Sequence, residues 1–188
     1  MKCKWLLFWV IVGLYLLGTV SIGYTTYNSP APKGGDELIE TIKIVFLCLG
    51  GLGIILPTYI NATNAIEERT VTRIENTFAL ITKWDDPHLF SARKLTRDIK
   101  LRRSSISDDE LIQEINENDE LKQSVHLVCN YFEQVRFSID TGRINLDLFK
   151  PVLGALIIDI INRFMPYINT IGDVYVQDLN KLKKSLES

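Results

Sequence analysis

Two long apolar runs near the amino terminus constrain the fold of this chain more than any other feature of its sequence. The first run, Trp5 to Tyr24, has 20 residues without a charge. As an α-helix it is about 30 Å long, which matches the hydrocarbon core of a bilayer. The second run, Ile44 to Ile60, extends to residues 42 and 62. We predict two membrane spans, over about residues 5–24 and 42–62. A cleaved signal peptide is disfavoured because no small-residue cleavage site follows the first run.

The flanking charges predict how this hairpin, residues 1–62, is oriented. Lys2 and Lys4 precede the first run, whereas Arg69 and Arg73 follow the second. The connection between the runs is short and rich in proline and glycine, as expected of a turn in water. By the positive-inside rule both termini lie in the cytoplasm, at a bacterial inner membrane.

Three glycines in the second run, Gly50, Gly51 and Gly53, allow close approach between helices. They fit packing within one hairpin and packing between subunits equally well. Neither run contains an ionisable acid or base, which disfavours a transporter with a buried charge relay.

Charge is concentrated in the rest of the chain. Residues 1–62 hold 4 of the 21 basic and 3 of the 23 acidic residues, so residues 63–188 hold 17 basic and 20 acidic ones. This composition predicts a soluble domain. Its net negative charge excludes a globally basic nucleic-acid binder, and we expect no DNA partner.

Helical periodicity runs through this soluble part. A stalk helix is predicted over 63–84, with an apolar face formed by Val71, Ile74, Phe78 and Ile81. Asp85-Asp86-Pro87 ends it, and Pro87 suits the first turn of the next helix, capped by Asp85 or Asp86.

Further helices complete an all-α bundle over residues 85–188. Ser107 to Glu110 forms a capping box, and Gly142 lies in the turn that ends a helix over 119–139. The 119–139 helix has an apolar face of Leu121, Val125, Val128, Phe132, Val135 and Ile139. Residues 146–171 are predicted to form a central buried helix, with Asp159 and Arg163 paired at i, i+4, and residues 174–186 form a last amphipathic helix.

No enzymatic motif is found in the sequence. His126 and Cys129 lie three residues apart, a spacing that fits one packed helix face better than a Cys–His nucleophile pair. Asp85-Asp86 fits helix capping better than metal binding. We expect no catalytic residues, no metal and no cofactor. The aromatic residues Tyr131, Phe132, Phe137 and Phe149 fit the core better than base stacking.

One basic cluster rises above this background. It consists of Arg93, Lys94, Arg97, Lys100, Arg102 and Arg103. Three interpretations stay open: a solvated helix face partly neutralised by the acidic stretch 108–120, a contact with anionic lipid headgroups, or a site in a shared cavity that binds a phosphate-rich ligand.

Four short motifs carry a resemblance to known proteins. They are Lys83-Trp84-Asp85-Asp86-Pro87, Asn130-Tyr131-Phe132-Glu133, Ile139-Asp140-Thr141-Gly142-Arg143-Ile144 and Pro166-Tyr167-Ile168. Over about residues 60–170 the chain resembles a family of small bacterial two-span membrane proteins with a helical domain. Its overall plan is similar to that of the type III CRISPR membrane effectors that bind cyclic tetra-adenylate.

This resemblance implies a homotetrameric effector of anti-phage defence that binds a cyclic oligoadenylate in its cytoplasmic domain and perturbs the inner membrane. The six basic residues are its expected ligand-binding residues on the charge argument alone. The alternative is a membrane-anchored module that binds a protein partner and no nucleotide.

Overall fold

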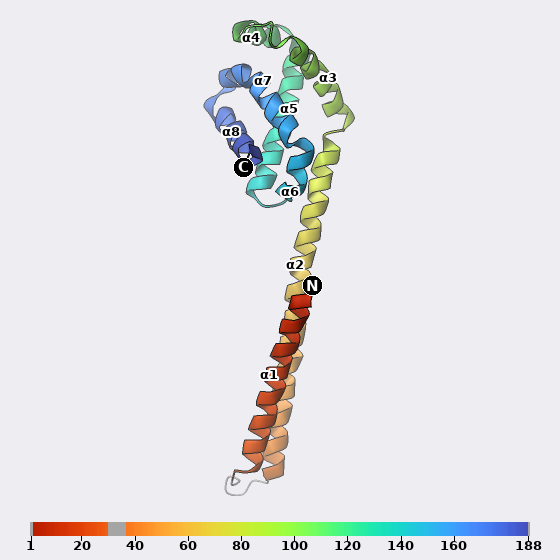
Figure 1. The fold of residues 1–188 in the computed structure, drawn as a ribbon, viewed down its shortest axis with the longest axis vertical. Helices are drawn as coiled ribbons and strands as arrows, with labels where there is room; N and C mark the ends of the chain where they lie inside the picture. Colours follow the sequence, from red (N-terminus) through yellow and green to blue (C-terminus); the bar gives the residue numbers. More distant parts are fainter. Residues whose placement is uncertain (1, 30–36, 188) are drawn as a thin grey trace. The chain divides into compact units, whose positions relative to one another are not determined.

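A computed structural model describes residues 2–29 and 37–187, and every regular element in them is helical. This confirms the all-α prediction. The elements are α1 (Lys2–Tyr27), α2 (Glu37–Lys83), α3 (Pro87–Arg102), α4 (Asp108–Glu117), α5 (Asp119–Asp140), α6 (Leu146–Phe149), the π-helical turn η1 (Lys150–Gly154), α7 (Ala155–Ile171) and α8 (Asp173–Glu187). The chain divides into two compact units, Met1–Ile66 and Glu67–Ser188, with α2 contributing to both. Figure 1 shows these elements.

In the first unit α1 packs antiparallel to the amino-terminal part of α2 (Figure 1). The rings of Phe8 and Tyr59 lie 5.2 Å apart between centroids. Near the other end of α1, a β-carbon on Gly23 would lie 3.8 Å from Val45 Cγ2. Phe8, near the start of α1, therefore lies beside Tyr59, whereas Gly23, near its end, lies beside Val45. This order is that of an antiparallel pair.

Gly51 has a packing role in this pair. A β-carbon at Gly51 would lie 2.5 Å from the hydroxyl oxygen of Tyr15. Because glycine has no side chain, the tyrosine hydroxyl can lie directly against the backbone of α2. The same position on Gly50 or Gly53 meets no atom of the described residues within 4 Å. Of the two open roles, packing within the hairpin applies to Gly51.

One described helical stretch, Phe8–Tyr27, is long and apolar enough to cross a membrane, with a mean hydropathy of 1.6. The predicted second span lies within α2, but the side chains at positions 48, 49 and 52 are outside the described residues. The second span therefore stays a prediction. The predicted turn at residues 30–35 also lies outside the described residues.

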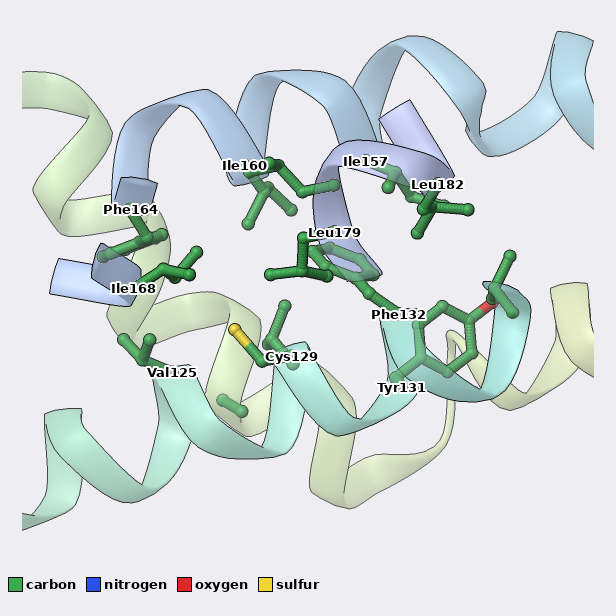
Figure 2. Packing of buried hydrophobic residues seen from close by; sticks show 14 of the residues in the cluster. Val125, Cys129, Tyr131, Phe132, Ile157, Ile160, Phe164, Ile168, Leu179 and Leu182 are labelled. Atoms are coloured by element: carbon green, nitrogen blue, oxygen red, sulfur yellow. The ribbon is translucent and has the colours of Figure 1, made fainter. Parts of the chain in front are cut away.

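The second unit is built around α5. The apolar face predicted for this helix is buried, with Ile139 partly so. Figure 2 shows Val125, Cys129 and Phe132 of α5 facing α7 and α8. The side chains that meet them are Ile157, Ile160, Phe164, Ile168, Leu179 and Leu182. Periodic apolar residues on three helices thus close one core.

The predicted apolar face of the stalk is only partly correct, since Ile81 packs against the core but two other members do not. Val71 and Phe78 are more than half exposed, whereas Thr77 and Leu80 of α2, and Trp84 directly after it, are buried. The aromatic end of α5 selects this face, since the Trp84 ring lies 5.0 Å from that of Tyr131. The Tyr131 hydroxyl also donates a hydrogen bond of 2.9 Å to the carbonyl of Leu80.

The helix break at Asp85-Asp86-Pro87 is confirmed, but the predicted capping is wrong. Asp86 occupies the N-cap position of α3 without a side-chain capping hydrogen bond. Asp85 instead pairs with Arg93, whose guanidinium reaches back from almost two helical turns into α3.

Other local predictions agree with the structure. Ser107 and Glu110 form the reciprocal capping box, and Gly142 has a φ of +63°, which favours glycine. The predicted single helix over 146–171 is divided into α6, η1 and α7. Pro151 lacks a backbone N–H, and the helix widens into a π-turn around it.

Replacing Phe132 with alanine should destabilise the helical domain by about 3–5 kcal/mol, because its ring is fully buried against Trp84 and α8. Phe137→Ala is the matched control. Its ring is half exposed, so the loss should stay below about 1 kcal/mol. Urea unfolding of the full chain in detergent, followed by near-ultraviolet circular dichroism, measures both. Equal losses would contradict the assignment of the core.

Candidate functional site

Five residues of the basic cluster lie on α3, and Arg103 follows its last residue. Leu89, Ala92, Thr96 and Ile99 face inward, and α3 packs along α5 through them. Helix α7 packs instead against α8 and α4. Long charged side chains of both α3 and α7 line the space between these two helices.

A cavity of about 370 Å³ lies between these two helices. From α3 it is lined by Arg93, Arg97 and Lys100, and from α7 by Asp159 and Arg163. Trp84 and the apolar residues Ala155, Leu156 and Ile160 complete the wall. Three of the six predicted ligand residues therefore meet in one cavity, with one more arginine that the prediction missed.

Arg163 is the most buried cation of the cavity, with 6 % of its side chain exposed. It pairs with Asp159 one turn earlier on α7, which confirms the predicted i, i+4 pair. It also donates a hydrogen bond of 3.2 Å to the carbonyl of Thr96 on α3. A buried charge requires such compensation, and the compensation links the two helices.

Asp159 is shared between two cations. Its Oδ2 atom accepts from Arg163 and from Lys100, whose Nζ atom lies 3.1 Å away. Half of the aspartate side chain is exposed. One carboxylate oxygen thus bridges α7 and α3.

Arg93 is held at the other end of the cavity. Its guanidinium bonds Asp85 Oδ1 at 2.9 Å and lies 4.7 Å from the centroid of the Trp84 ring. Its Nε atom is buried and has no hydrogen-bond partner in the described part of the chain. The cation is therefore fixed in place with one donor unsatisfied.

Arg97 differs from its neighbours because it lines the cavity without a carboxylate partner among residues 2–29 and 37–187. The cavity and its immediate partners hold four cations, Arg93, Arg97, Lys100 and Arg163, against two carboxylates, Asp85 and Asp159. The arrangement has an excess of two positive charges and suits an anion.

The other predicted ligand residues lie outside this cavity. Lys94 is exposed and is not part of the wall. Arg102 makes two hydrogen bonds to Glu114, which raise the pKa of its guanidinium above the ordinary value. Arg103 pairs with Asp108 and bonds the carbonyl of Ile106 at 3.0 Å. For these two arginines the structure matches the interpretation as a face neutralised by the 108–120 stretch.

His126 and Cys129, three residues apart on α5, have different surroundings. The His126 ring lies 3.2 Å from the hydroxyl of Tyr167, and Cys129 is buried in the core. Burial raises the pKa of the Cys129 thiol to about 12, so it is protonated at neutral pH. Among the described residues, no group of three or more histidines, cysteines or acids could hold a metal ion.

Sequence reasoning could have found Arg163 from its pairing with Asp159 in an otherwise apolar helix. A charge pair in such a segment has to face a polar partner, and the basic face of α3 is the strongest polar surface in the sequence. The sequence alone did not indicate that α3 and α7 are in contact.

Comparison with known protein families gives one match. The family model of a domain of unknown function, DUF4760, matches residues 46–180, which is most of the chain. The chain belongs to the DUF4760 family. Neither a curated protein nor a solved structure gives a match.

Cys129 should resist alkylation in the folded protein. In a Cys3→Ser, Cys48→Ser background, iodoacetamide at pH 8 should label it only after unfolding, since burial and a pKa of about 12 keep the thiol protonated and covered. Mass spectrometry of the full chain with and without denaturant measures this. Fast labelling of the native protein would contradict the buried position.

Proposed function

We propose that this protein is a membrane-anchored sensor whose helical domain binds a phosphate-bearing ligand in the cavity between α3 and α7. The observation that carries the proposal is an arginine, Arg97, that has no carboxylate partner in the described part of the chain and lines a cavity with excess positive charge. Arginine forks and lysine are the side chains that proteins use most for phosphate oxygens. The fully apolar part of the wall leaves room for a non-phosphate portion of the ligand.

The ligand we propose is cyclic tetra-adenylate, bound by a homotetramer. A cavity of about 370 Å³ lies at the small end of ligand pockets, which span roughly 300–1,000 Å³. One chain therefore offers room for one phosphate-bearing portion of the ligand. Four copies around a symmetry axis would offer four such sites to a ring with four phosphates. On this proposal the protein is an effector of type III CRISPR defence that perturbs the inner membrane when the ligand binds.

The membrane anchor we propose has two spans. Residues 44–66 contain no charged residue, as do residues 5–32. Large apolar side chains point away from the α1–α2 contact, with Phe46, Leu47 and Ile54 about 70–80 % exposed. Antiparallel packing of α1 on α2 supports a hairpin that enters and leaves on one side, and lysines and arginines outside the spans favour a cytoplasmic position for both termini.

Arg97→Glu should reduce ligand affinity at least about tenfold while leaving the fold intact, because it reverses a cavity charge that has no carboxylate partner among the described residues. Lys94→Glu is the matched control, since it makes the same charge change on the same helix outside the cavity wall. Isothermal titration with cyclic tetra-adenylate, on the full chain in nanodiscs at about 0.15 M salt, measures both.

No binding of cyclic tetra-adenylate by the unaltered protein at micromolar concentration would contradict this ligand. An equal loss of ligand affinity in the two variants would show that the ligand is attracted by positive charge in general and does not bind in the cavity. Copurification of a protein that Arg97→Glu releases would favour the alternative, a membrane-anchored interaction module.

The orientation predicts resistance to protease from outside. Protease added to spheroplasts should leave the helical domain intact and should degrade it only after the membrane is opened. An antibody against a carboxy-terminal tag follows the digestion, and a periplasmic protein serves as the control. Digestion in closed spheroplasts would place the domain outside the cell, away from any intracellular ligand.

A further inference from the structure

We propose that Asp159 occupies the position of a ligand phosphate oxygen and must leave it when the ligand binds. This inference rests on the proposed function and concerns the same cavity. It assigns Asp159 as an internal competitor that sets the affinity and the charge selectivity of the site.

The contacts of Asp159 are those expected of a bound phosphate oxygen. One atom, Oδ2, accepts from Lys100 on α3 and from Arg163 on α7. These two cations lie on opposite walls of the cavity, and a phosphate oxygen between them would make the same two charge-assisted hydrogen bonds. The aspartate and a phosphate oxygen therefore compete for one place.

Burial decides which partner can move. Arg163 has 6 % of its side chain exposed and is tied to the carbonyl of Thr96, so it cannot follow a departing carboxylate. The side chains of Asp159 and Lys100 are about half exposed. Asp159 can rotate into water, where a carboxylate is well solvated, while the buried guanidinium stays and needs a new anion.

The cavity also has more donors than one carboxylate satisfies. Arg97 has no carboxylate partner within the described part of the chain, and the buried Nε atom of Arg93 has no acceptor there. An ion with several oxygens and more than one negative charge can replace Asp159 and engage Arg97 at the same time. A singly charged ion such as chloride gains only the first of these contacts, so the exchange favours phosphate esters and diphosphates.

The test compares Asp159→Asn with Glu114→Gln in the full chain. Both changes neutralise a carboxylate that pairs with an arginine, but Glu114 pairs with Arg102 outside the cavity. The probes are inorganic pyrophosphate and cyclic tetra-adenylate, titrated into nanodiscs of phosphatidylcholine, which carry no net charge. Asp159→Asn should bind both probes about tenfold more tightly than the unaltered protein, because no internal carboxylate has to be displaced. Glu114→Gln should bind as the unaltered protein does.

A second measurement needs no variant and decides the question if Asp159→Asn fails to fold. Carbodiimide labelling of carboxylates, read by mass spectrometry, should modify Asp159 of the unaltered protein faster when pyrophosphate is bound. Labelling of Glu114 should not change. Faster labelling supports the exchange.

The two proposals fail in different ways. If the unaltered protein binds a probe, but Asp159→Asn binds no more tightly and Asp159 labelling stays constant, the competitor role is overturned and the proposed function stands. If neither protein binds cyclic tetra-adenylate or pyrophosphate, the proposed site is overturned as well.

Discussion

Burial of the Arg163 guanidinium is the interaction on which the arrangement of the site depends. A charge removed from water needs partners, and Arg163 finds them in Asp159 on its own helix and in the Thr96 carbonyl on α3. Because α3 packs mainly along α5, and α7 along α8 and α4, these polar contacts bridge a gap that the apolar core leaves. The gap is the cavity. The cavity is charged because polar contacts, and not apolar packing, join α3 to α7.

The basic cluster of α3 separates into two groups with different environments. Arg102 and Arg103, at the end of the helix, meet acids from the stretch that begins with α4. Exposed pairs of this kind contribute little to stability, about 0–1 kcal/mol each, but they remove those arginines from competition for a ligand. Arg93, Arg97 and Lys100 lie further back and face α7, which offers one acid and one more cation. Sequence spacing put all six in one set, and the facing helices divide them.

Much of the local structure could be predicted from the chain. The break before Pro87, the Ser107–Glu110 capping box, the glycine turn at Gly142 and the buried face of α5 depend on residues within a few positions of one another. The errors arose where distant residues decide. The stalk buries Leu80 and Trp84 instead of Val71 and Phe78 because the aromatic residues of α5 lie on that side. Asp85 turns away from a capping role because Arg93 offers a stronger partner.

The sequence by itself determined the helices, the two uncharged stretches that favour a membrane hairpin, and the excess of positive charge on one segment. These properties follow from backbone preferences and from the cost of placing charge in an apolar medium, which act locally. Tertiary structure alone decided which cations are neutralised and which remain available, and it brought Arg163 and Asp159 to the basic face of α3. The physical reason is that the state of a charge depends on the groups around it in space, and residues about 60 positions apart become neighbours only when the core closes.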